Sequence, residues 1–254
     1  MKKKIIVLIV LILPIVSFAS VSNSELINIA GKQRMLSQRI AKDYLYIGKK
    51  IATSKANRQL EKSMKDFLSA HKKLLLSIND PEIRNLLDFV ELSSNDFKDI
   101  ASQDFDLDNA QLILDLSESM LEGSQYVFDS LQKRFKIKKS NIIGKSAKQR
   151  MLSQRIAKYY ISYQSGIKDK NTVDMMKETV KQFSENLHML MKNATNTPQI
   201  NRKLAEIDKL WNIVHKFYNN IEKGGLPLIV FNTTDNITKK MDEVTTMYIS
   251  SSKK

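Results

Sequence analysis

Apolar residues recur three and four positions apart along nearly the whole chain, which is the pattern of helices with one buried face. Residues 60–75 show it clearly, with apolar side chains on one face at Leu60, Met64, Phe67, Leu68, Leu74 and Leu75. Residues that favour a helix start precede such stretches, at Ser22, Asp80, Asp106 and Thr197. Because the 254 residues include only 7 glycines and 4 prolines, the pattern predicts an all-α fold.

One segment occurs twice without change, since residues 32–42 and 148–158 both read KQRMLSQRIAK. Phe67 and Phe183 occupy the same place in the two copies, and Pro81 and Pro198 follow with a shift of one residue. A duplication of this extent indicates that each half of the chain is one structural unit. The sequence therefore predicts two tandem four-helix bundles, at residues 20–138 and 139–254.

The junction between the two copies lacks strong helix breakers. Residues 109–166 contain no proline, and Gly123 and Gly144 are the interior glycines. We therefore expect the last helix of the first copy to continue into the first helix of the second, which stacks the bundles end to end. A bend within residues 138–144 would instead place the bundles side by side.

The N-terminus has the features of an export signal. Three lysines follow Met1, an apolar run covers residues 5–16, and small residues at Ser17 and Ala19 precede a cleavage point before Ser20. We expect residues 1–19 to be a cleaved signal peptide, with an uncleaved anchor as the alternative. The absence of cysteine suits a periplasmic protein that folds without disulfides.

The first helix of each copy carries two stripes of residues. The expected core stripe of the first copy is Leu26, Ile29, Gln33, Leu36, Ile40 and Tyr44. A second stripe lies roughly 110° away around the helix and contains Ile27, Ala30, Arg34, Ala41 and Leu45, with Gly31 and Gln38 at its edge. Lys32, Arg39 and Lys42 are expected to point into solvent.

Small residues beside Arg34 allow another helix to approach, and a guanidinium that loses water there needs a negative partner. No acidic residue lies between Glu25 and Asp43, and none lies within residues 133–168, where Arg150 repeats the arrangement. Two interpretations stay open. A small inorganic anion binds the planar guanidinium, or each arginine pairs with a carboxylate on a neighbouring helix.

Residues 28–39, NIAGKQRMLSQR, resemble the opening segment of the PilJ-type domain. This is the N-terminal domain of type IV pilus methyl-accepting chemotaxis transducers, related to the periplasmic domains of nitrate/nitrite sensor kinases. The resemblance implies a four-helix bundle that dimerises along its first helix. It also implies that the arginine of the Arg-Met pair binds an anion across the dimer, here Arg34 and Arg150. Gln38 and Gln154, one turn further on, are expected secondary donors.

These features predict a periplasmic sensory or ligand-binding module for a small anion such as nitrate or nitrite. We expect it to act as a homodimer, or to present its first helix to a membrane receptor of the same family, because the sequence shows no second membrane helix and no signalling domain. Ala30-Gly31 becomes Ser146-Ala147 in the second copy, so the resemblance does not imply equal affinities. The alternative function is an envelope adaptor or spacer with protein contacts only.

Other chemistry is not expected. No nucleophile triad, glycine-rich phosphate loop or paired acid cluster stands out, so we predict no enzyme, no catalytic residue and no cofactor. Glu185 and His188 have the spacing used in di-iron bundles, but that design needs two such motifs, so no metal is expected. The net charge of +14 alone suits nucleic acid, but an exported chain without aromatic stacking platforms is not expected to bind it.

Overall fold

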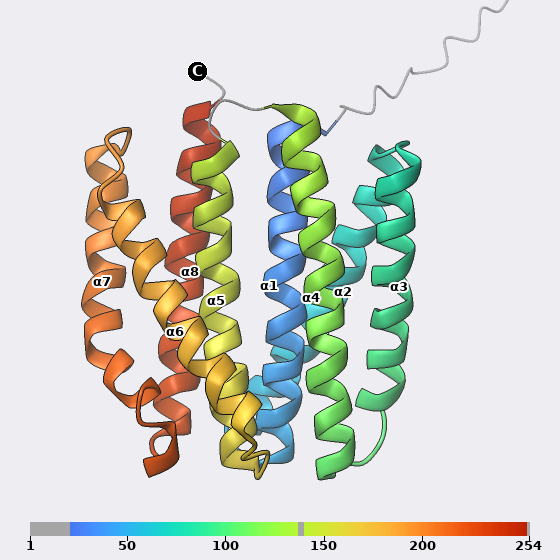
Figure 1. The fold of residues 1–254 in the computed structure, drawn as a ribbon, viewed down its shortest axis with the longest axis vertical. Coiled ribbons are helices and arrows are strands. Elements are labelled where there is room, and N and C mark those ends of the chain that lie inside the picture. The colour runs from blue at the N-terminus through green and yellow to red at the C-terminus, as the bar shows by residue number, and fades with distance from the viewer. Residues whose placement is uncertain (1–20, 137–139, 253–254) are drawn as a thin grey trace, which may run out of the picture.

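The computed structural model describes residues 21–136 and 140–252, and helices account for most of them (Figure 1). The first copy contains α1 (Asn23–Gly48), α2 (Thr53–Ser77), α3 (Pro81–Ala101) and α4 (Leu107–Phe135). The second copy contains α5 (Ser140–Ser165), α6 (Lys170–Met191), α7 (Pro198–Tyr218), the short 3-10 helix η1 (Ile221–Lys223) and α8 (Pro227–Ser252). The described residues form no strand, so the predicted all-α fold is confirmed.

Side-chain caps explain where the helices begin. The Ser22 hydroxyl accepts a hydrogen bond from the backbone N–H of Glu25 at 3.3 Å, at the start of α1. Asp80 accepts from the N–H of Ile83 at 3.1 Å, and Pro81 fills the first turn of α3, where its missing N–H costs nothing. These caps were readable in the sequence, and they fix the helix starts to within a few residues.

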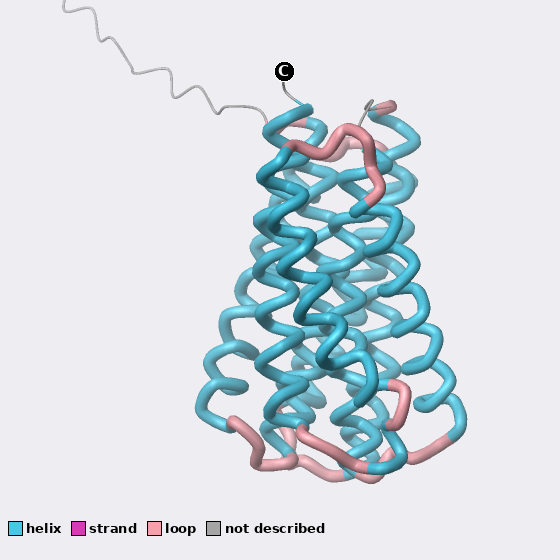
Figure 2. The backbone as a smooth tube through the Cα atoms, turned by 90° about the vertical axis from the view of Figure 1, so that its left-hand side faces the viewer, coloured by secondary structure: helices cyan, strands magenta, loops and turns pink. Residues whose placement is uncertain are grey.

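Each copy is a bundle of four helices, and the two bundles lie side by side. In the first copy α1 packs against α2 and α4, and α3 packs against α4; in the second, α5 packs against α6 and α8, and α7 against α8. The two copies meet along α1 and α5, which lie next to each other at the centre of the molecule (Figure 1). The connections gather at the two ends of the helices (Figure 2).

The expected end-to-end stacking is wrong. Helix α4 ends at Phe135, and Lys136 adopts a left-handed conformation with φ 46°. Residues 137–139 lie outside the described part, and α5 then runs back alongside α1. The physical reason is the second stripe of α1, because a rod would leave it in solvent. Packing on α5 instead leaves Ile27, Ala30, Ala41 and Leu45 with an exposed fraction of 0 %.

The expected solvent position of Lys42 is also wrong, since its exposed fraction is 0 %, as is that of its counterpart Lys158. With the bundles side by side, α8 reaches Lys42 and α4 reaches Lys158. The predicted signal peptide and the boundary at residue 138 lie outside the described residues. Among the helices that are described, none combines the length and hydropathy needed to cross a membrane.

Candidate anion-binding site

Two buried arginines meet where α1 packs against α5. Arg34 has an exposed fraction of 2 % and Arg150 of 0 %. The two helices run in register, so that Gly31 faces Ala147. A Cβ atom placed on Gly31 would lie 2.9 Å from the Ala147 Cβ, 3.5 Å from Nη2 of Arg150 and 3.6 Å from Nη2 of Arg34. The missing side chain of Gly31 thus leaves room for both guanidinium groups in one small region.

Arg150 is bound by side chains of the chain itself. Its Nη1 donates to the carboxylate of Asp242 on α8, and its Nη2 donates to Oδ1 of Asn28 on α1 at 3.0 Å. Its Nε has no hydrogen-bond partner among the described residues. For Arg150 the interpretation as an ordinary ion pair with a neighbouring helix is therefore correct.

Arg34 has much weaker compensation. Its Nη1 donates to Oε1 of Gln125 on α4 at 2.5 Å, and its guanidinium carbon lies 3.7 Å from the centre of the Phe128 ring. Within the described residues Nε and Nη2 have no hydrogen-bond partner. The carboxylate of Asp129 accepts from the Gln125 amide at 2.8 Å and acts on Arg34 through its negative charge. Among the residues that the structure describes, no carboxylate forms an ion pair with Arg34.

Burial lowers the pKa of Arg34 to about 9, since removal from water disfavours the charged form. The negative charge of Asp129 opposes this effect, and the positive charge of Arg150 adds to it. Burial also lowers the pKa of Arg150, where Asp242 opposes the effect. Because a guanidinium keeps its proton in proteins, a bound anion is the direct way to stabilise Arg34 in this position.

A pocket of about 210 Å³ opens beside Arg34, between α4 and the first turns of α5. Its charged lining residues are Arg34, Lys145 and Lys148, and it has no acidic lining residue. The rest of its lining is mostly amide and aromatic: Gln125, Phe128, Gln132, Asn141 and Gly144. The size and charge of this pocket suit a small anion.

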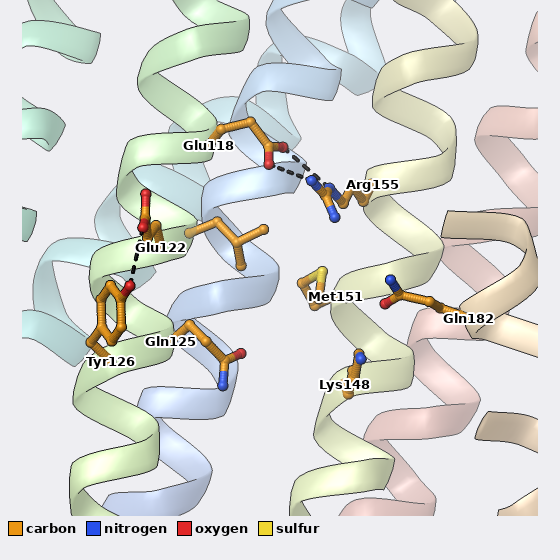
Figure 3. A pocket seen from close by; sticks show the side chains of 9 residues that line it. Glu118, Glu122, Gln125, Tyr126, Lys148, Met151, Arg155 and Gln182 are labelled. Carbon is orange, nitrogen blue, oxygen red and sulfur yellow. Dashed lines mark hydrogen bonds and ion pairs between the residues drawn. The ribbon is translucent and has the colours of Figure 1, made fainter. Parts of the chain in front are cut away.

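A second pocket, of about 470 Å³, lies between α4, α5 and α6 and shares Gln125 and Lys148 with the first (Figure 3). Glu118 lines it but is bound by Arg155, whose Nη2 lies 2.5 Å from the carboxylate. Burial lowers the pKa of Lys148, and the nearby charges of Arg34 and Arg155 lower it further. Lys148 thus lies between the two pockets, and burial together with the neighbouring arginines outweighs the charges of Glu178 and Asp129 on its pKa.

The structure does not bring Gln38 and Gln154 into the same arrangement as the arginines. The Gln38 amide donates to the backbone carbonyl of Ser117 on α4 at 2.9 Å. The Gln154 amide donates to the Thr238 hydroxyl on α8 at 2.7 Å. These two donors hold α4 and α8 against the central helices, and their role as secondary ligands stays a prediction.

Sequence reasoning missed two ion clusters that join the copies. Lys42 on α1 pairs with Asp235 on α8 at 2.8 Å. In the equivalent place on the other side, Lys158 on α5 pairs with Glu118 on α4. Each acid belongs to the opposite copy from its lysine, so the two pairs tie the bundles together. The one available signal was that both lysines lie inside the repeated segment.

The pairs have different surroundings. Burial raises the pKa of Glu118, but Lys158 and Arg155 outweigh it and hold that pKa well below its usual range. Next to Lys42, burial raises the pKa of Asp43 to about 7 despite the opposing charges of Lys42 and Arg39. No group of three or more metal-ligating side chains is placed to hold a metal ion within the described residues.

The fold and the site define a tandem pair of helical bundles with a buried cationic centre between them. The family model for the type IV pili methyl-accepting chemotaxis transducer N-terminal domain matches residues 15–88 and 137–230. The chain therefore belongs to this family of sensory domains, and the two matched segments correspond to the two copies. No curated protein matches the chain. No solved structure matches it either.

Proposed function

We propose that this protein is a periplasmic sensory module that binds a small anion of the nitrate or nitrite type between α1 and α5. The observation that carries the proposal is Arg34, a buried cation with two unpaired N–H groups among the described residues, beside a pocket lined by lysines. Arg150 adds a second positive charge across the same interface. Membership of a sensory family supports a binding role rather than a catalytic one.

Arg34 and Arg150 lie together at the interface between the two copies of one chain. The resemblance places an equivalent pair of arginines across a dimer of two chains. The face of α1 that was expected to meet another chain is packed on α5. A homodimer or a receptor that used this face would have to displace α5, so the homodimer stays a prediction. In our proposal the receptor contacts another surface of the bundle, and the anion changes the packing of α1 on α5 that the receptor senses.

The export of the protein is part of the proposal. Residues 1–19 would act as a signal peptide that is cleaved before Ser20. The family supports a chemotaxis-type receptor as the partner. No nucleic acid or cofactor has a part in this function.

Isothermal titration of residues 20–254 with sodium nitrate and sodium nitrite tests the proposal, in a gluconate buffer without small inorganic anions. An anion that binds only the folded protein raises its unfolding free energy, by about 2.7 kcal/mol at one hundred times the Kd. The double variant Arg34→Gln, Arg150→Gln should lose both the heat and the shift in Tm. The exposed Arg202→Gln is the matched control.

Absence of nitrate and nitrite binding in the wild type would refute the proposal and favour the adaptor function. Unchanged binding in the folded double variant would refute the assignment to this interface. Circular dichroism of each variant establishes that it is folded before binding is compared.

A further inference from the structure

The duplication allows the two arginines to be compared position by position. Arg34 and Arg150 are equivalent, as are Gln125 on α4 and Asp242 on α8, since the side-chain oxygen of each accepts a hydrogen bond from Nη1 of its own arginine. The corresponding glutamine bonds, from Gln38 to Ser117 and from Gln154 to Thr234, show the same correspondence. The comparison therefore rests on matched contacts.

Two substitutions make the half-sites different. A neutral amide, Gln125, contacts Arg34 where the carboxylate of Asp242 contacts Arg150. Gly144 stands where Asn28 stands in the other copy, and Asn28 binds Nη2 of Arg150 at 3.0 Å. Arg150 thus has a counter-charge at Nη1 and a hydrogen-bond acceptor at Nη2, whereas among the described residues Arg34 has only the neutral Gln125 at Nη1.

The free donors of Arg34 lie on one edge of its guanidinium. Nε–H and Nη2–H point in nearly the same direction, and together they bind two oxygens of a single planar anion. Both groups are unpaired at Arg34 among the described residues, whereas at Arg150 the Nη2 of this edge is bound by Asn28. Two parallel donors favour an anion with two oxygens on one atom over a single-atom halide.

The pockets beside the two half-sites differ in charge as well. The pocket of about 210 Å³ at Arg34 has three basic and no acidic lining residues. A pocket of about 260 Å³ lies beside Asn28 and Asp242, and it contains three acids, Glu25, Asp66 and Asp242, against two lysines. An anion is attracted to the first pocket and repelled from the second.

We propose that the two copies have diverged into one anion-accepting half-site at Arg34 and one half-site closed by the chain's own Asp242. This inference rests on the proposed function. The ligand is a small planar oxyanion, which binds with its two oxygens on Nε and Nη2 of Arg34 and enters through the pocket between α4 and α5. Asp242 takes the place of a second anion, so one chain binds one ligand.

Exchanging the two equivalent residues tests the inference by titration with nitrate. Gln125→Asp places at Arg34 the counter-charge that Asp242 gives Arg150, and it should weaken nitrate binding at least tenfold. Gln182→Asp adds the same charge in the neighbouring pocket (Figure 3) and should change the Kd less than threefold. Asp242→Gln removes the negative charge that neutralises Arg150, so Arg150 adds its full positive charge to the interface and nitrate binding should tighten at least threefold.

A second variant covers the case in which Gln125→Asp fails to fold. Gly144→Asn restores at Arg34 the amide that Asn28 provides to Arg150. Its Cβ would lie 2.8 Å from the amide nitrogen of Gln132 and 3.0 Å from Cζ of Phe128, so both side chains have to shift slightly. Binding should weaken, because the amide occupies Nη2 of Arg34.

The wild type should bind one nitrate per chain, and formate should compete with it while chloride competes poorly. Two equal sites per chain, or equal nitrate affinity in wild type, Gln125→Asp and Asp242→Gln, would overturn the divergence and leave the proposed function standing. Absence of nitrate, nitrite and formate binding in the wild type would overturn both.

Discussion

Replacing Arg34 with methionine should make the anion-free protein more stable. Burial lowers the pKa of Arg34 to about 9, and at about 1.4 kcal/mol per pKa unit this disfavours the charged form by roughly 4–5 kcal/mol. The contact with Phe128 and the hydrogen bond to Gln125 offset part of this, each by about 1–2 kcal/mol. Methionine has a similar length and no charge to bury. The remainder, up to about 3 kcal/mol, is the expected gain.

Equilibrium urea unfolding in gluconate buffer, followed by circular dichroism, measures this gain. Arg150→Met is the matched control, and it should lose stability, since it breaks the ion pair with Asp242 and the bond to Asn28. Adding nitrate should then stabilise the wild type and leave Arg34→Met unchanged. If Arg34→Met is less stable than the wild type by about 1 kcal/mol or more, Arg34 is well compensated without an anion and the reasoning fails.

Three further outcomes are expected. Burial raises the pKa of Asp43 to about 7, so folding takes up a proton between the ordinary pKa of an aspartate and pH 7, and the free energy of unfolding falls as the pH rises through this window. Asp43→Asn should remove this difference between pH 5 and pH 8 in urea unfolding. An unchanged difference in the variant would contradict the prediction. Glu118→Gln leaves the buried Lys158 without its carboxylate partner and should lower the free energy of unfolding by about 3–5 kcal/mol. The double variant Glu118→Leu, Lys158→Met should regain most of this stability. Equal losses of stability in the two variants would count against the ion pair. Gly31→Val should push α1 away from α5, because even a Cβ atom at this position would lie 2.9 Å from the Ala147 Cβ. The variant should lose about 1–3 kcal/mol of stability and its nitrate binding. An unchanged Kd in the titration would disprove this.

The helices and their starts could be read from the sequence because they depend on local chemistry. Ser22 and Asp80 cap their helices as predicted, and Pro81 fills a first turn. The two copies were also evident, because the repeated segment is unchanged. The side-by-side packing was not, since a stripe of small residues on a helix shows that something packs there but not which helix does so.

The same limit applies to the site. Arg34 and Arg150 have nearly identical local sequences, and they differ in their contacts with α4, α8 and Asn28. Gln125 and Asp242 become equivalent only after a shift of one residue from the repeat, so the exact repeat offset does not pair them. Lys42 looked solvent-facing because its partner, Asp235, lies at the other end of the sequence.

Proton–nitrogen NMR of the arginine Nε–H groups during a nitrate titration tests the central claim most directly. The signal of Arg34, assigned from its loss in Arg34→Met, should shift progressively and stop changing at one nitrate per chain. The signal of the exposed Arg202 should stay in place. An Arg34 signal that does not move while nitrate is at millimolar concentration would contradict the account.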